Sequence, residues 1–230
     1  FPVQIAAEVK DFDPNLVIEN GKDIKKMDRF IQFGLKAVAE AMKDANFSEN
    51  VDELGYKSES FGIVSAAGIG GLPNIEKNSN ILLEKGPKRV SPFFIPSALV
   101  NMLGGFISIA HNLKGPNLSS VTACAASTHA ICEAVKCIMI GEARKMLVVG
   151  AESTICPIGM AGFSSMKALS ARNDDPQHAS RPFDGERDGF VMGEGAGALV
   201  LEEYEDAKAR GAIIYGEIIG FGESGDAHHI

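Results

Sequence analysis

Tryptophan is absent from this 230-residue sequence, and only four cysteines are present. The cysteines form no C-x-x-C pair and no second cluster; they are Cys124, Cys132, Cys137 and Cys156. This spacing disfavours a structural zinc site and a disulfide framework, and it suits a reducing compartment such as the cytoplasm. An excess of positive charge is also missing, because the formal net charge is -8. The sequence therefore disfavours a general nucleic-acid-binding protein, which needs a basic surface.

The sequence also lacks an apolar run long enough to cross a bilayer, which takes about 20 residues. The longest apolar stretch, residues 98–113, is interrupted by Asn101, the pair Gly104-Gly105, Ser108 and His111. We expect a buried helix there, and no segment has the features of a signal peptide. The chain opens on Phe1 rather than Met and closes on Ile230, so both ends are expected to be cut from a longer protein.

The composition that remains is ordinary for a globular α/β protein, with 45% hydrophobic residues and 25 glycines. Short apolar segments with strand character occur at residues 61–66, 118–123, 146–149, 197–201 and 212–220. Helical periodicity is clear over residues 27–42, and the segment 125–141 is apolar on most sides. Residues 118–149 thus predict a βαβ unit. The whole pattern predicts one α/β unit with a parallel or mixed sheet and helices on both faces.

Cys124 occupies the corner between the predicted strand at 118–123 and the predicted helix at 125–141. The first N–H groups of a helix have no partner within it and carry a partial positive charge. Such a corner favours a nucleophilic thiolate and can stabilise an oxyanion on a carbonyl under attack. A cysteine that packs as a small apolar residue is the alternative, and chemistry alone leaves both open. His129 lies five residues further along the helix, so it points away from the sulfur and is predicted to be structural.

Two glycine-rich segments do not fit nucleotide-binding loops. Residues 68–73 place Pro73 where the third glycine of a G-x-G-x-x-G motif belongs. Residues 193–197 precede a predicted strand rather than a helix N-terminus, so they offer no anion site. Asp226, His228 and His229 are a weak metal candidate, because adjacent histidines on an extended chain do not face one point. The sequence predicts neither a metal nor a cofactor.

Several motifs occur together in an order typical of one family. They are Lys26-Met27-Asp28-Arg29-Phe30-Ile31-Gln32, Ser91-Pro92-Phe93-Phe94-Ile95-Pro96, Thr122-Ala123-Cys124 with Thr128-His129-Ala130, Ala168-Leu169-Ser170, Arg181-Pro182-Phe183-Asp184, and the block from Arg187 to Gly197. On these residues the chain resembles the β-ketoacyl-[acyl-carrier-protein] synthases of the thiolase superfamily, and most of all their synthase II branch. The resemblance runs from end to end and makes Cys124 the expected nucleophile. One departure is Ser127, where the family often has glycine.

The resemblance implies a thiolase-like layered α/β fold, αβαβα in the full enzyme. Residues 1–230 would be its N-terminal domain, truncated at both ends. It also implies a decarboxylative Claisen condensation without a cofactor, in which Cys124 holds an acyl group as a thioester and malonyl-carrier protein adds two carbons. The expected partner is acyl-carrier protein, and the expected enzyme is a cytoplasmic homodimer in fatty-acid elongation. The family's two catalytic histidines, its lysine and a second oxyanion-hole donor are expected beyond Ile230.

The resemblance further identifies candidate residues around the nucleophile. Ile69 and Phe163 would line the fatty-acyl pocket, and Phe94 and Ile95 would reach it from the partner subunit; ordinary core packing is the alternative for all four. Since the carrier protein is acidic, a local basic patch is also expected. Its candidates are Lys25, Lys26, Arg29, Lys88, Arg89, Lys167 and Arg172.

Three other functions remain open on the sequence. The chain could belong to a synthase I-type enzyme or to another thiolase-superfamily condensing enzyme that uses coenzyme A. It could be a non-catalytic partner like a chain-length factor, although such proteins lack the nucleophilic cysteine. It could also be a fragment without turnover of its own. The sequence does not indicate the preferred length of the acyl chain.

Overall fold

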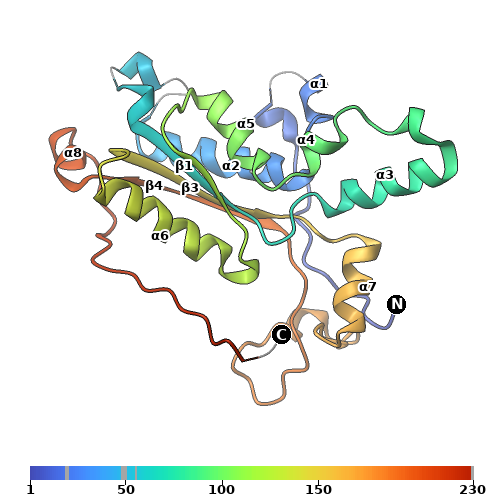
Figure 1. The fold of residues 1–230 in the computed structure, drawn as a ribbon. Coiled ribbons are helices and arrows are strands. Elements are labelled where there is room, and N and C mark those ends of the chain that lie inside the picture. Colours follow the sequence, from blue (N-terminus) through green and yellow to red (C-terminus); the bar gives the residue numbers. More distant parts are fainter. Residues whose placement is uncertain (19–20, 48–50, 55, 229–230) are drawn as a thin grey trace. The chain divides into compact units, whose positions relative to one another are not determined.

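The computed structural model describes residues 1–18, 21–47, 51–54 and 56–228. Its helices are α1 (Gly21–Ile24), α2 (Arg29–Asp44), α3 (Leu72–Lys85), α4 (Phe94–Ala98), α5 (Met102–His111), α6 (Ala126–Met139), α7 (Pro157–Ser165) and α8 (Tyr204–Ala209) (Figure 1). Its strands are β1 (Phe61–Ala66), β2 (Asn117–Ser120), β3 (Lys145–Glu152) and β4 (Gly195–Glu202). Short 3₁₀ turns are η1 (Pro14–Leu16), η2 (Val51–Leu54), η3 (Ser58–Ser60), η4 (Pro87–Arg89), η5 (Ala123–Ala125) and η6 (Pro176–His178).

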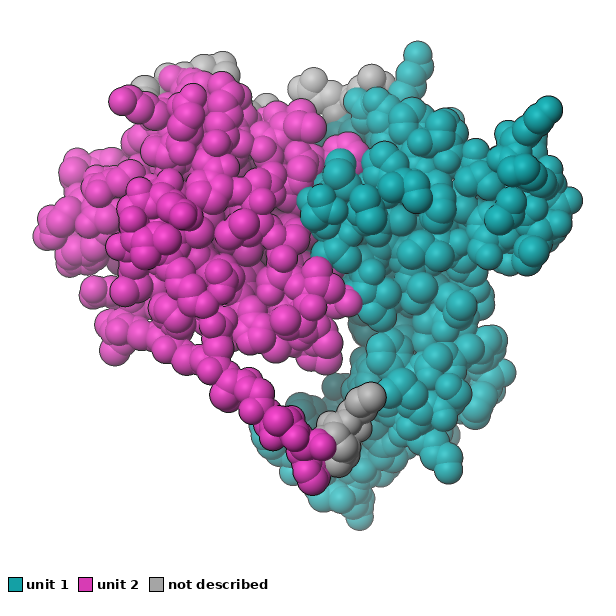
Figure 2. Space-filling model, in the orientation of Figure 1, with its two compact units in different colours: residues 1–36, 69–102, 151–196 teal, residues 37–68, 103–150, 197–230 magenta. Residues whose placement is uncertain are grey.

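The chain groups into two compact units (Figure 2). The first unit comprises residues 1–36, 69–102 and 151–196, and the second comprises residues 37–68, 103–150 and 197–230. Each unit is therefore built from three separate stretches of the sequence. That residues 1–230 form a single domain stays a prediction.

The second unit contains most of a four-stranded sheet with the strand order β2-β1-β3-β4. β1 is parallel to both of its neighbours, so Val64 lies opposite Leu118 of β2 and Val148 of β3. All of β1 and the first five residues of β3 are buried, as expected for parallel strands that are covered on both faces. The predicted strand at residues 61–66 and the predicted βαβ unit, here β2, α6 and β3, are confirmed.

Helices cover both faces of this sheet (Figure 1). Three alanines of α6 lie in a buried cluster with Val64 and Ala66 of β1: Ala126, Ala130 and Ala134. Alternate side chains of a strand point to opposite faces, so Ser65 points to the other face, toward α5. There a Cβ on Gly104 of α5 would lie 3.0 Å from the Ser65 hydroxyl oxygen. Small residues thus allow helices to approach the sheet closely on both sides.

The first unit is held by a small apolar cluster and by close backbone packing. Val3, Leu169 and Met192 are buried together in the cluster, although they lie far apart in the sequence. Gly71, which precedes α3, packs so tightly that a Cβ there would lie 2.5 Å from the Cα of Ala98 at the end of α4. This contact fixes the loop that follows β1 against α4.

The strand predicted at residues 212–220 is wrong. These residues form no helix or strand, and their apolar side chains are exposed, for example those of Ile213 and Ile219. Their pattern has strand character, but a strand forms only where a neighbour accepts and donates its ladder of hydrogen bonds. The strand before Cys124 is also shorter than predicted, because β2 ends at Ser120.

The long apolar stretch at residues 98–113 is a helix only in part. α4 ends at Ala98 and α5 begins at Met102, so the two helices are separated by a short break. Leu103 and Ile107 of α5 are fully buried, as predicted for this segment. No helix among the described residues is long and apolar enough to cross a membrane.

Candidate active site

Cys124 lies at a sharp corner between β2 and α6. It is the middle residue of the 3₁₀ turn η5, and α6 begins two residues later. Ala123 has a φ of 50°, a left-handed conformation that is uncommon for a residue other than glycine. Backbone of this kind is concentrated at functional sites, where the surrounding structure maintains it. The Cys124 thiol is free and exposed, whereas the other cysteines are free and buried: Cys132, Cys137 and Cys156. In this structure Cys124 is not packed as a buried apolar residue, and its role as the nucleophile stays a prediction.

Helix α6 begins beside Cys124 without a capping side chain. Its N-cap is Ala125, which has no polar side-chain atom, and its first turn contains no Asp or Glu. The partial positive charge at this end of the helix is not offset from within the turn, so an anion beside it is stabilised. Thr122 Oγ1 lies 2.6 Å from Nδ1 of His129, a residue of α6. His129 thus has a structural partner, in agreement with its predicted role.

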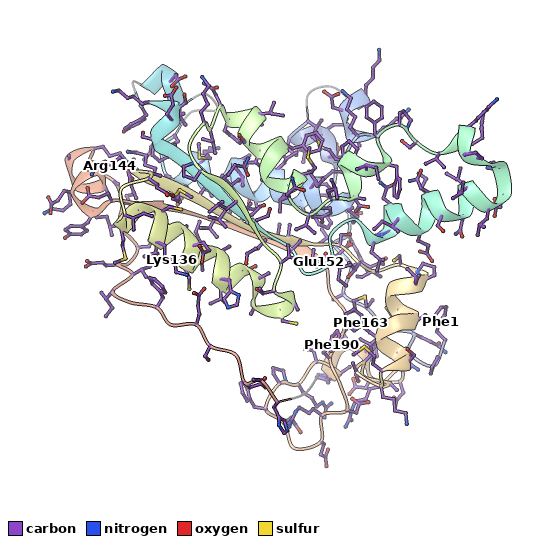
Figure 3. All side chains as sticks on the ribbon, viewed as in Figure 1. Phe1, Lys136, Arg144, Glu152, Phe163 and Phe190 are labelled. Atoms are coloured by element: carbon purple, nitrogen blue, oxygen red, sulfur yellow. The ribbon has the colours of Figure 1, made fainter. Side chains whose placement is uncertain are left out.

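Ile69, a predicted acyl-pocket residue, lies in the loop between β1 and α3. The carboxylate of Glu152, the last residue of β3, accepts the N–H groups of Ile69 at 2.8 Å and of Gly70 at 2.9 Å (Figure 3). Gly70 has a φ of 78°, which favours glycine. In a dinucleotide site, amides of this kind bind a phosphate. Here they bind a carboxylate of the same chain, which agrees with the sequence argument against nucleotide binding.

The other predicted pocket residues lie on two helices of the first unit. Phe163 of α7 contacts Phe190 edge to face, with ring centroids 5.4 Å apart and an interplanar angle of 80° (Figure 3). Phe94 and Ile95 begin α4; Phe94 is half-buried, and Ile95 is 58% exposed. Cys124 belongs to the second unit. That it shares one pocket with these residues stays a prediction.

Arg29, a member of the predicted basic patch, is engaged in contacts within the first unit. Its guanidinium donates to the Glu194 carboxylate, with an N–O distance of 3.0 Å, and to the Val9 carbonyl at 2.6 Å. It also lies 4.7 Å from the ring centroid of Phe33. Burial opposes ionisation of Glu194, but hydrogen bonds from Ser153 and Arg29 hold the pKa of its carboxyl below the ordinary value. Arg29 is thus the structural counter-ion of a buried carboxylate.

Other members of the basic patch differ in how free their charges are. The Arg172 guanidinium donates to the Glu186 carbonyl at 2.7 Å and lies 3.6 Å from the Asp188 carboxylate. Lys26 pairs with Asp23 at 2.5 Å. The remaining four candidates are exposed: Lys25, Lys88, Arg89 and Lys167. The patch as a whole stays a prediction.

No metal centre emerges from the part of the chain that the structure describes, because no group of three or more His, Cys, Asp or Glu side chains there could hold an ion. Of the weak candidate ligands near the chain end, Asp226 accepts the backbone N–H of His228 at 3.4 Å. His229 lies outside the described residues.

Three contacts of the candidate residues do not follow from the sequence. The hydrogen bond between Thr122 and His129 and the carboxylate clamp of Glu152 were not predicted. Phe190 was overlooked as a contact of Phe163, although it lies within a recognised motif block. The sequence around Glu152 does not indicate its role, because its hydrogen-bond partners are 82 and 83 residues away.

Comparison with known proteins gives one consistent family. The family described as "Beta-ketoacyl synthase, N-terminal domain" matches residues 3–207. The 3-oxoacyl-[acyl-carrier-protein] synthase 2 of Coxiella burnetii is 50% identical over 230 residues, which is 100% of this chain and 54% of that protein. The chain thus spans about half the length of such relatives.

Solved structures agree in fold. The crystal structure of a β-ketoacyl synthase from Burkholderia phymatum superposes with a TM-score of 0.86 at 34% identity, covering 99% of this chain and 55% of that one. A type II PKS acyl-carrier protein in complex with its ketosynthase bound to the hexaketide, AntDE:AntF, gives a TM-score of 0.74 at 27% identity, covering 90% and 56%. The α/β fold is therefore the thiolase-like fold of ketosynthases. With the match over residues 3–207, these likenesses show that the chain belongs to the β-ketoacyl synthase family.

Proposed function

We propose that this chain is part of a 3-oxoacyl-[acyl-carrier-protein] synthase 2, which lengthens acyl chains in fatty-acid synthesis. The observation that carries the proposal is the free thiol of Cys124, held next to the left-handed Ala123 at the uncapped start of α6. This is where the helix dipole favours a thiolate. The name of the Coxiella burnetii relative, at 50% identity, supports the reaction class.

In the proposed first step, the Cys124 thiolate attacks the thioester carbonyl of an acyl-carrier protein. A C–S bond to Cys124 forms, the C–S bond to the carrier breaks, and the carrier thiolate takes up a proton. Malonyl-carrier protein then loses carbon dioxide, and the electron pair of the broken C–C bond attacks the acyl-Cys124 carbonyl. The chain leaves on the carrier two carbons longer, and the Cys124 thiolate is regenerated. Decarboxylation supplies the carbanion, so this reaction uses no cofactor.

The start of α6 suits this chemistry. Both steps pass through a tetrahedral intermediate with an oxyanion, and backbone N–H groups at the corner would stabilise it. One such donor typically contributes about 3 kcal/mol to the transition state. The uncapped first turn adds the positive end of the helix dipole on the same side.

We infer that acyl-carrier protein delivers both substrates. The AntDE:AntF complex of an acyl-carrier protein with its ketosynthase, a neighbour in fold, supports this partner. Four exposed cations are the candidates for contacting the acidic carrier: Lys25, Lys88, Arg89 and Lys167. Arg29 and Arg172 are weaker candidates, since both already bind carboxylates or carbonyls of the first unit.

We also infer a homodimer with an acyl pocket completed across the interface. β2 lies at one edge of the sheet, and an edge strand offers unpaired N–H and C=O groups to a second copy. Leu118 on this strand is exposed. The pocket would be lined by Ile69 and Phe163, with Phe94 and Ile95 contributed by the partner subunit. A thiol nucleophile also suits a reducing cytoplasm.

Mass spectrometry of the full-length protein after incubation with a labelled acyl thioester tests the proposal. We expect one acyl adduct on Cys124, none on the three buried cysteines, and none in a Cys124→Ser variant. Adding malonyl-carrier protein should then remove the adduct and yield a product longer by two carbons. Labelling elsewhere with Cys124 unmodified would refute the assignment of the nucleophile, and an adduct that persists with malonyl-carrier protein would refute the condensation.

A further inference from the structure

The bond between Thr122 and His129 joins the two sides of the nucleophile's corner. Thr122 lies two residues before Cys124, and His129 lies five residues after it. Thr122 Oγ1 and His129 Nδ1 are 2.6 Å apart, within hydrogen-bond distance. We propose that this pair is a positioning device that sets the direction of the Cys124 thiol. The inference rests on the proposed role of Cys124 as the acyl acceptor.

Among the described residues, little else holds this corner. No residue of η5 is buried within them, so the core that they form does not fix its backbone. Ala123 is left-handed, and a non-glycine residue stays in that conformation only when its surroundings impose it. Among the described residues, the bond to His129 is the side-chain hydrogen bond that reaches this corner. The backbone adds bonds of its own, such as that from the Ala125 N–H to the Thr122 carbonyl at 3.1 Å.

The helix end of the bond is firmly anchored. His129 immediately precedes Ala130, which is fully buried in the cluster that packs α6 on β1. The sheet therefore fixes α6, α6 fixes the imidazole, and the imidazole fixes Thr122. This sequence of contacts transmits the rigidity of the core to an exposed turn two residues from the sulfur.

The bond can form in every protonation state of the imidazole. When Nδ1 carries no proton, the Thr122 hydroxyl donates to it; when Nδ1 is protonated, it donates to the hydroxyl oxygen. In this proposal His129 therefore acts through geometry, whichever of its nitrogens carries the proton. His129 is a positioning residue: by holding the Thr122 side chain, it fixes the backbone that leads to Cys124.

Matched variants of the full-length protein separate this role from simple loss of structure. Thr122→Val removes the hydroxyl but keeps the shape, whereas Thr122→Ser keeps the hydroxyl. His129→Phe removes the ring nitrogen, whereas His129→Asn keeps a polar atom close to the place of Nδ1. The rate of Cys124 acylation by an acyl thioester is the main readout. The rate of Cys124 alkylation by iodoacetamide is the second, because a small reagent needs an accessible thiol but no particular direction.

We expect Thr122→Val and His129→Phe each to slow acylation about fivefold, the ratio that corresponds to one net hydrogen bond. The double variant should be no slower than either single one, since both remove the same bond. Thr122→Ser and His129→Asn should stay within about twofold of the native rate, and alkylation should change by less than about twofold in every variant.

Three results would overturn the inference: native acylation rates in Thr122→Val and His129→Phe, losses that multiply in the double variant, or alkylation that falls as far as acylation. The proposed function fails in a different way, namely if the native protein is alkylated on Cys124 but never acylated there.

Discussion

Replacing Asp28 with asparagine should remove a pH dependence from the stability of this protein. Asp28 directly precedes α2, its side chain is buried, and its Oδ2 accepts the backbone N–H of Asn74 in the first turn of α3 at 3.1 Å. Its Oδ1 has no hydrogen-bond partner among the described residues. Burial raises the pKa of Asp28 from the ordinary 3.8 to about 6, with a smaller contribution from the charge of Glu152. Between pH 3.8 and about 6, the folded protein therefore holds a proton on Asp28 that the unfolded chain releases.

The sign and size of the effect follow from this difference. Since the folded pKa is raised, the contribution of Asp28 to stability is fully present below pH 3.8 and is lost as the pH rises through about 6. One pKa unit corresponds to about 1.4 kcal/mol, so the loss is roughly 3 kcal/mol. Asparagine keeps an oxygen for the Asn74 N–H but has no charge to desolvate. Between acidic and neutral pH, the free energy of unfolding of the variant should therefore rise by that amount relative to that of the native protein.

Urea unfolding of both proteins at several pH values between about 4 and 8 measures this difference. Subtracting the two free energies of unfolding cancels the other titrating groups, which are common to both proteins. As the pH rises, the native protein should become less stable relative to Asp28→Asn, and the difference between their free energies of unfolding should level off above about pH 7. A difference that is flat across this range, or one that changes in the opposite direction, would refute the assignment of a raised pKa to Asp28.

Two further predictions concern a close packing contact and an ion pair. Gly62→Ala in β1 should destabilise the protein by about 2 kcal/mol in urea unfolding, because its Cβ would lie 2.5 Å from the Pro116 carbonyl oxygen. The control is Gly162→Ala in α7, where nothing lies within 4 Å of the added Cβ, and it should be neutral or slightly stabilising. Equal losses of stability at both glycines would contradict the contact at Gly62. Arg29→Met should cost about 2 kcal/mol at pH 7, since it removes the cation paired with the buried Glu194 carboxylate. The cost should shrink as the pH falls and Glu194 becomes protonated; a loss independent of pH would argue against the ion pair.

The parts of the fold that follow from local pattern were predictable from the sequence. β1 is a short, mostly apolar segment and α6 is apolar on most sides, so the sequence predicted both, and the corner at Cys124 with them. Residues 212–220 have an equally strand-like pattern, but a pattern does not supply a neighbouring strand. The sequence therefore predicted a strand there that the structure does not form.

The contacts that tune the site were not predictable, because they join segments that are distant in the sequence. From the sequence, Arg29 looks like an ordinary surface cation. In the structure it donates a hydrogen bond to Glu194, which is 165 residues away. Similarly, the motif around Cys124 indicated the expected nucleophile but not the hydrogen bond between Thr122 and His129. Motifs identified the kinds of residue, and only the fold assigned their partners.

The clamp of Glu152 on the loop after β1 has a consequence for how this protein distinguishes its ligands. In nucleotide-binding enzymes the N–H groups of a glycine-rich loop bind an anionic phosphate of the ligand. Here the chain provides that anion itself, through two N–H bonds at 2.8 and 2.9 Å. The conformation of the loop is then settled when the protein folds and does not vary with the concentration of any small molecule. The acyl chain that we propose to lie against Ile69 would therefore contact a loop whose shape is already fixed. Acyl chains of different length would then be distinguished by how well they fit that shape.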